Sequence, residues 1–125
     1  MARPKIAKIA PDEAATRLPR ELPRWSVKDG ALVRIYRFHG WKGTALAFGA
    51  VAHLAEAAWH HPDVVAGWGR LEVRLSTHEV GGISERDFAL AKKIEEIVAW
   101  RPGDLGGALE GTPEDPASAY LKRDD

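Results

Sequence analysis

The chain has 125 residues, of which 45% are hydrophobic, and its 18 Lys or Arg residues are balanced by 18 Asp or Glu. This length fits one domain with a real core, and the zero net charge argues against a general nucleic-acid binder, which would carry a basic excess. The absence of cysteine excludes disulfides and thiolate sites, and no apolar run or leader pattern indicates a membrane, so we expect a cytoplasmic protein that binds small molecules or proteins.

Residues 1–10 are basic and show neither a helix cap nor a periodic pattern, so we expect a loose arm. Pro11 followed by two acidic residues is typical of a helix start, because proline suits the first turn and acids favour the positive end of the helix dipole. This short helix is predicted to cover residues 11–18 and to close at Pro19 and Pro23.

Two strands are predicted at residues 25–27 and 31–38, joined through Asp29-Gly30, because Asp-Gly is a strong hairpin signal. A long helix is predicted at residues 41–58. Apolar residues recur along it at spacings of three and four, which indicates one helical stripe made of Trp41, Ala45, Phe48, Ala52, Ala55 and Trp59.

Residues 68–76 alternate apolar with polar side chains and predict a strand, and Gly81-Gly82 predicts a turn after it. A second long helix is predicted from Ser84 to about residue 100. Its expected buried side consists of Leu90, Ile94, Ile97 and Val98.

The composition changes after residue 101, where Gly, Pro, Asp and Glu dominate. We therefore expect three segments: a loose arm at 1–10, a domain at 11–101 and a polar tail at 102–125, with a docked turn near Tyr120. The order of elements predicts an α+β domain of two layers, with a four-stranded antiparallel sheet, two long helices and a short N-terminal helix on one face.

Three of the five histidines lie between positions 60 and 78, and their side chains can give and take protons near neutral pH. His60 and His61 follow the predicted helix 41–58 and precede Pro62, where a favourable interaction with the helix dipole is one explanation. His78 is predicted at the end of a strand that returns toward them. The grouping therefore favours proton-transfer chemistry.

A metal site is the alternative for three histidines, since zinc catalysis often uses three protein ligands. Adjacent side chains such as His60 and His61 tend to diverge, however, and no two histidines have the spacing that places them on one helix face. We expect neither a metal nor an organic cofactor. His39 and His53 lack such neighbours and are interpreted as structural.

Two carboxylates accompany the histidines. Asp87 lies three residues after Ser84, the spacing of a capping box, and it could also orient the strand-end histidine, His78. Glu56 precedes His60 by one helical turn and is either a surface acid or the partner of that histidine.

The spacing of these residues resembles the pterin-4a-carbinolamine dehydratase family over roughly residues 12–100. That family shows an acidic or polar residue, a His-His-Pro triplet, an aromatic residue, a further His and an Asp at fixed separations. Every separation is met here by Glu56, His60-His61-Pro62, Trp68, His78 and Asp87.

The resemblance implies dehydration of 4a-hydroxytetrahydropterin to quinonoid dihydropterin, which recycles the pterin cofactor of an aromatic amino acid hydroxylase. It implies catalysis by His60, His61 and His78 with support from Asp87. The sequence does not decide which histidine is acid and which is base, and we expect His60 as the base at N5 and His78 near the departing hydroxyl. The pterin site would be lined by Trp59, Glu56, Pro62, Ser76, Thr77 and Glu79.

The resemblance also implies a homo-oligomer, either a dimer or a tetramer. Some relatives act as dimerisation cofactors of transcription factors, and others are assembly chaperones that have lost catalytic residues. This chain keeps the full histidine set, which favours the enzyme over these two alternatives.

Overall fold

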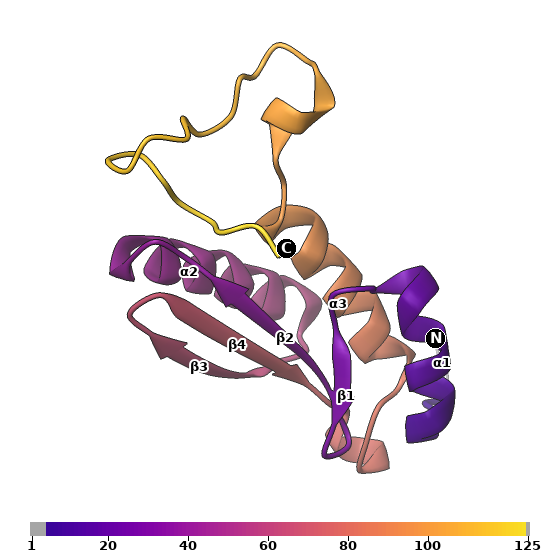
Figure 1. The fold of residues 1–125 in the computed structure, drawn as a ribbon. Helices are drawn as coiled ribbons and strands as arrows, with labels where there is room; N and C mark the ends of the chain where they lie inside the picture. The colour runs from indigo at the N-terminus through magenta and orange to yellow at the C-terminus, as the bar shows by residue number, and fades with distance from the viewer. Residues whose placement is uncertain (1–4, 125) are drawn as a thin grey trace.

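The computed structural model describes residues 5–124 and shows an α+β domain of two layers (Figure 1). The elements in chain order are α1 (Pro11–Glu21), β1 (Ser26–Lys28), β2 (Ala31–Arg37), α2 (Trp41–Ala58), β3 (Asp63–Gly67), β4 (Arg70–Leu75), the 3₁₀ turn η1 (His78–Val80), α3 (Glu85–Val98) and the 3₁₀ turn η2 (Pro102–Leu105).

The four strands form one antiparallel sheet, as predicted, and their order in it is β1-β2-β4-β3. The β1–β2 hairpin turns at Asp29 and Gly30, which both have positive φ, 50° and 75°. Two consecutive left-handed residues give a turn whose twist matches that of the flanking strands. The central pair is in register through Leu32 opposite Leu75, so both project from one face.

The helices cover one face of the sheet, with α2 and α3 behind it in Figure 1 and α1 beside β1. Alternate residues of the two central strands point into this layer and are fully buried, while their neighbours face away from the helices. The core contains Leu32, Tyr36, Leu71, Val73, Leu75, Val51, Phe88 and Ile94.

The first helix does not close at Pro19. Pro19 lies inside α1, which continues to Glu21, and the amide of Leu22 still bonds to the carbonyl of Leu18 at 2.8 Å. A proline inside a helix removes one hydrogen bond. Leu18 and Leu22 are both buried on either side of it, and their packing holds the helix together across this position.

The stripe predicted on α2 does not face the core. Ala55 is its only buried member, and Trp41, Phe48 and Trp59 are exposed. The buried face is built instead from the small residues Gly43, Thr44, Ala47, Val51 and Ala55. These let the helix backbone approach the sheet closely: a Cβ at Gly43 would lie 3.0 Å from the Phe38 side chain.

Ile97 of α3 likewise faces solvent instead of the core, whereas Leu90, Ile94 and Val98 are buried as predicted. The predicted loose arm is also partly fixed. Its residues 1–4 lie outside the described residues, but Ile9 is buried and its amide bonds to the carbonyl of Ile83 at 2.8 Å.

The C-terminal tail leaves α3, loops over the helices and returns to β2 (Figure 1). Its last residues pair with the end of that strand: the amide of His39 bonds to the carbonyl of Tyr120, and the amide of Lys122 bonds to the carbonyl of Arg37. Tyr120 packs edge-on against Phe38, with ring centroids 5.8 Å apart. The docked turn predicted near Tyr120 is therefore present, and the contact continues beyond it.

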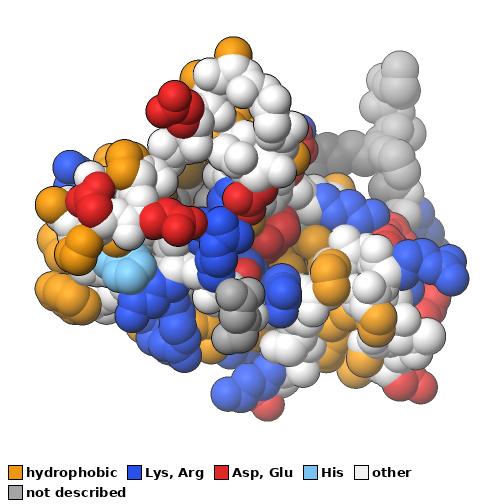
Figure 2. All heavy atoms as spheres, turned by 45° about the horizontal axis from the view of Figure 1, so that its top comes forward, with side chains coloured by type: hydrophobic (Ala, Val, Ile, Leu, Met, Phe, Trp, Pro, Cys, Tyr) orange, Lys and Arg blue, Asp and Glu red, His pale blue; other side chains and the backbone are white. Residues whose placement is uncertain are grey.

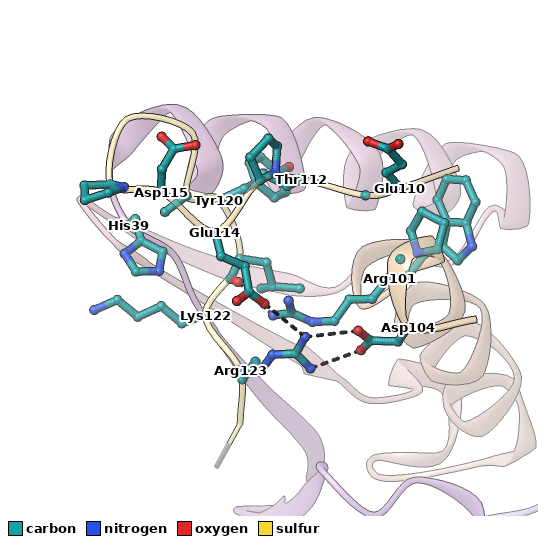
Figure 3. A pocket seen from close by; sticks show the side chains of 18 of the residues that line it. His39, Arg101, Asp104, Glu110, Thr112, Glu114, Asp115, Tyr120, Lys122 and Arg123 are labelled. Carbon is teal, nitrogen blue, oxygen red and sulfur yellow. Dashed lines mark hydrogen bonds and ion pairs between the residues drawn. The ribbon is translucent and has the colours of Figure 1, made fainter. Parts of the chain in front are cut away.

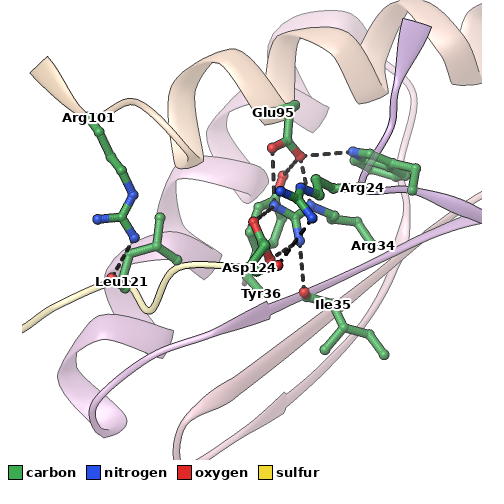
Figure 4. A network of polar contacts seen from close by, with 9 residues as sticks. Arg24, Arg34, Ile35, Tyr36, Glu95, Arg101, Leu121 and Asp124 are labelled. Carbon is green, nitrogen blue, oxygen red and sulfur yellow. Dashed lines mark hydrogen bonds and ion pairs between the residues drawn. The ribbon is translucent and has the colours of Figure 1, made fainter. Parts of the chain in front are cut away.

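Beyond Tyr120 the tail is held by a buried arginine (Figure 4). Arg34 of β2 is 2% exposed and donates hydrogen bonds to both Glu95 of α3 and Asp124 of the tail. Glu95 also accepts from the indole of Trp25 and the hydroxyl of Tyr36. Across residues 5–124, no helix combines the length and apolar character needed to cross a membrane.

Candidate active site

The end of α2 sets the direction of the histidine pair. Trp59 adopts a left-handed conformation, with φ 51° and ψ 47°, and the amide of His60 bonds back to the carbonyl of Ala55 at 3.1 Å. This pattern ends a helix and reverses the chain, but the left-handed position is normally occupied by glycine. A tryptophan there is strained, and such strain tends to accumulate at functional sites.

His60 faces the start of α3. Its Nε2 lies 2.6 Å from Oδ1 of Asp87, and its side chain is 14% exposed, while Asp87 is fully buried. The end of α2 and the first turn of α3 are far apart in sequence. This hydrogen bond links the two helices directly, in addition to their packing in the core.

Asp87 has a second, structural role as a helix cap. Its Oδ2 accepts the amide of Ser84 at 2.9 Å, and the hydroxyl of Ser84 accepts the amide of Arg86 at 3.2 Å. The predicted capping box is therefore present. Asp87 also orients a histidine, but this histidine is His60, where the sequence had suggested a neighbour at the end of a strand.

Thr77 completes the surroundings of Asp87. Its hydroxyl donates to Oδ2 of Asp87 at 2.8 Å and lies 2.6 Å from the hydroxyl of Ser84. The side chain of Thr77 is fully buried and its hydrogen bonds are directed inward, so it does not form part of an open surface. The sequence indicated Ser84 only as a helix cap. Its [ST]-x-x-[DE] spacing to Asp87 is the signal that could have placed it in this hydrogen-bond network.

His61 points in a different direction and pairs with Glu56, whose Oε1 lies 2.6 Å from its Nε2. The sequence had suggested His60 as the partner of Glu56. The left-handed Trp59 turns the chain before His60. As a result His61, five residues after Glu56, contacts the Glu56 carboxylate in place of His60. The exposed ring of Trp59 stands edge-on to His61, with centroids 5.0 Å apart.

His78 lies just outside the sheet, not at a strand end. Strand β4 ends at Leu75, and His78 opens η1, where the paired backbones of Thr77 and Gly82 close the turn. His78 is exposed and directly follows Thr77, whose hydroxyl bonds to the same Asp87 that holds His60.

The remaining predicted lining residues are next in sequence to His61, Thr77 or His78. Ser76 and Glu79 are exposed, Pro62 is half-buried, and Glu79 accepts a hydrogen bond from Arg86 at 3.1 Å. Within residues 5–124, no three His, Asp or Glu side chains are arranged to hold a metal ion. His39 and His53 are both exposed and stand apart from these contacts.

A cavity of about 1120 Å³ lies elsewhere, under the C-terminal tail (Figure 3). Its wall includes His39 and Arg101, and the guanidinium of Arg123 spans it between Asp104 and Glu114. On this side of the molecule basic side chains gather next to the acidic ones of the tail (Figure 2). None of the predicted site residues lines the cavity, so the histidine network is a separate feature.

Comparison with known proteins supports one family. The family model described as "Pterin 4 alpha carbinolamine dehydratase" matches residues 7–97. Proteins named "Putative pterin-4-alpha-carbinolamine dehydratase" are similar: that of Haloarcula marismortui is 44% identical over 68% of this chain and 89% of its own, and that of Thermomicrobium roseum is 42% identical over 70% and 95%.

A solved structure shows the same fold. The crystal structure of a "transcriptional coactivator/pterin dehydratase" from Brucella melitensis aligns with a TM-score of 0.67 and 26% identity, over 74% of this chain and 99% of the other. The matched family region ends at residue 97, so the tail that docks on β2 lies beyond it.

Proposed function

Because the chain belongs to the pterin 4 alpha carbinolamine dehydratase family, we propose that it dehydrates 4a-hydroxytetrahydropterin to quinonoid dihydropterin. His60, His61 and His78 act as the acid–base groups, and Asp87 supports them. The product can be reduced again, so the reaction recycles the pterin used by an aromatic amino acid hydroxylase, and we place it in the cytoplasm.

The hydrogen bond between His60 and Asp87 carries this proposal. A carboxylate can only accept, so the proton on this bond belongs to Nε2 of His60. Nδ1, the other ring nitrogen, then carries no proton and is the atom at which His60 accepts one from the substrate. A buried carboxylate that fixes the tautomer of a histidine is the arrangement that serves a general base.

The reaction needs one proton removed and one supplied. The N5–H proton leaves to a base, the N5 lone pair forms the C4a=N5 double bond, and the C4a–O bond breaks as the departing hydroxide takes a proton and leaves as water. Two imidazoles in opposite protonation states supply both transfers, and general acid–base catalysis contributes about 10²–10⁴-fold. We assign His60 as the base at N5 and His78 to the departing hydroxyl.

The exposed residues around the pair suit a flat heteroaromatic ligand. Trp59 is 72% exposed and is available to stack on a pterin ring, while Glu56 holds His61 through a hydrogen bond. Glu79, Ser76 and the backbone of Thr77 offer polar contacts. We propose that these groups bind the pterin.

A role in protein assembly is the second candidate, since the Brucella melitensis relative is described as a coactivator as well as a dehydratase. The exposed apolar side chains of Trp41 and Phe48, seven residues apart on one face of α2, provide a surface for a second copy of the chain or for another protein. We propose a homo-oligomer formed at least partly through this face.

Direct turnover of the carbinolamine separates the two candidates. The purified chain should accelerate dehydration above the spontaneous rate, which must be subtracted. Asp87→Asn should lower kcat, because an amide can present a donor to His60 and reverse the fixed tautomer. A wild-type protein with no rate above background would reject the enzyme and leave the assembly role.

A further inference from the structure

The two hydroxyl groups of Thr77 and Ser84 lie in the protein interior next to the proposed catalytic carboxylate. Both side chains are fully buried, and their oxygens are 2.6 Å apart. We propose that they are positioning residues, which act through Asp87 to fix the ring of His60. This proposal rests on the dehydratase function proposed above and extends the catalytic unit by two residues.

Counting donors gives the direction of every hydrogen bond in the network. As a carboxylate, Asp87 only accepts, so the single proton of the Thr77 hydroxyl is directed to Oδ2 of Asp87. Thr77 must then accept the proton of the Ser84 hydroxyl. Ser84 in turn accepts from the amide of Arg86, which has no alternative but to donate.

The result is a one-way chain that runs from the first turn of α3 to the carboxylate. Aligned hydrogen bonds of this kind polarise one another and strengthen the last link. The positive end of the α3 dipole adds to the same effect, because Asp87 lies in the first turn.

The two oxygens of Asp87 therefore have separate tasks. Oδ2 receives Thr77 and the amide of Ser84, which prevents rotation of the carboxylate, and Oδ1 is left for Nε2 of His60. A carboxylate held on one oxygen presents the other at a fixed position. Removal of the Thr77 hydroxyl would leave Oδ2 with the Ser84 amide alone, which loosens the carboxylate and lets His60 sample both tautomers.

The family resemblance had suggested Thr77 as a pterin-lining residue, and the two roles predict different kinetics. A lining side chain would raise KM when changed, whereas a positioning side chain lowers kcat and leaves KM nearly unchanged. Thr77→Val removes only the hydroxyl, and Thr77→Ser restores it. Thr44→Val is a matched control, since Thr44 is equally buried and its hydroxyl bonds only to backbone carbonyls.

We expect Thr77→Val to lower kcat about tenfold, a part of the range of general acid–base catalysis, with KM changed less than about twofold. Thr77→Ser and Thr44→Val should remain close to wild type. ¹⁵N chemical shifts of His60 in the free protein should show Nε2–H alone in wild type and a mixture of tautomers in Thr77→Val.

A second variant covers a failure of Thr77→Val to fold. Ser84→Gly removes the other hydroxyl, while glycine keeps most of the helix-capping preference. It should lower kcat by less than Thr77→Val, because the Thr77 proton still reaches Asp87. Unchanged kcat together with an unchanged His60 tautomer in these variants would overturn the proposal. If the wild type shows no dehydration, the proposed function fails, and the tautomer shifts still decide the positioning role.

Discussion

Arg34 donates two parallel hydrogen bonds, each 2.8 Å long, to the carboxylate of Asp124, and it makes a second bidentate pair with Glu95 (Figure 4). Burial by itself would lower the pKa of Arg34, but the hydrogen bonds to the two carboxylates outweigh it and raise that pKa. The same contact holds the pKa of Asp124 below its usual range. The tail is thus attached to the centre of the sheet by charge as well as by backbone pairing.

Asp124→Asn is expected to destabilise the domain by about 1 kcal/mol, because the side chain of Asp124 is partly exposed and solvent screens the pair. Arg34→Met should cost more, about 3 kcal/mol, since it leaves Glu95 without its cation. Urea unfolding measures both. Lys93→Gln, which removes the exposed pair with Glu96, is the control and should change stability by less than about 0.5 kcal/mol.

A chain ending at Arg101 should keep the turnover rate, because every predicted site residue lies before that position. It should unfold more easily than the full chain, since it loses the contacts of Tyr120 with Phe38 and of Asp124 with Arg34. A rate reduced tenfold or more at a temperature where the truncated chain is folded would show that the tail contributes to the site.

Glu95 predicts how stability depends on pH. Burial would raise its pKa, but the hydrogen bonds and charge of Arg34, with the hydroxyl of Tyr36, lower it below the ordinary value of 4.5. The folded protein then binds fewer protons than the unfolded chain. The contribution of Glu95 is complete above 4.5 and is lost as the pH falls through the lower folded pKa.

Urea midpoints measured from about pH 7 to about pH 3 test this sign. Glu95→Gln should reduce stability at neutral pH and show a smaller further decrease in acid than wild type. Glu96→Gln, at the exposed neighbouring position, should follow the wild-type curve. A Glu95→Gln chain that loses as much stability in acid as wild type would contradict the assignment.

Local signals in the sequence were enough for the architecture but not for the direction of the helix faces. Asp29-Gly30, the alternation in β4 and the Ser84-x-x-Asp87 spacing each specify a local geometry that tertiary packing does not alter. The buried face predicted for α2 is wrong, because the large apolar residues of this helix do not face the core. Small residues bring α2 against the sheet, and the tryptophans are left outside.

At the candidate site, too, local features were predictable from the sequence and contacts between distant segments were not. The spacing of the motif located His60 and Asp87, but their partners depend on the left-handed turn at Trp59, and a non-glycine residue gives no sequence signal for that conformation. The ion pair between Arg34 and Asp124 joins residues far apart in sequence, and the residues around neither of them predict it.

Assembly is expected to depend on α2. Trp41 and Phe48 are 57% and 44% exposed and lie seven residues apart, so they form one exposed apolar face of the helix. Phe48→Glu should shift the protein toward the monomer, and the exposed change Lys42→Glu on the same helix should not. Light scattering of the dilute wild-type chain that gives a 13.7 kDa monomer would defeat the prediction.

The histidines are expected to differ in their effect on turnover. His61→Ala and His60→Gln should each slow dehydration by at least about tenfold, within the range of acid–base catalysis. Glutamine is preferred at position 60 because alanine would leave the buried Asp87 without this donor and reduce stability. His78→Ala should also impair turnover, with a larger share in KM. His39→Ala and His53→Ala are the controls and should retain the wild-type rate.

Trp59 offers a test in which stability and activity move apart. Trp59→Ala and Trp59→Gly both remove the ring that stands beside His61, and both should raise KM for the pterin if the ring forms a wall of the site. Only glycine relieves the left-handed backbone, so Trp59→Gly should be more stable than Trp59→Ala by about 1 kcal/mol. Thermal unfolding gives the stability difference, and initial rates over a range of substrate concentrations give KM. Equal KM values in the two variants, both above wild type, would assign the loss to the ring. A KM that recovers in Trp59→Gly would assign it instead to the backbone, and an unchanged KM in both would remove Trp59 from the pterin site.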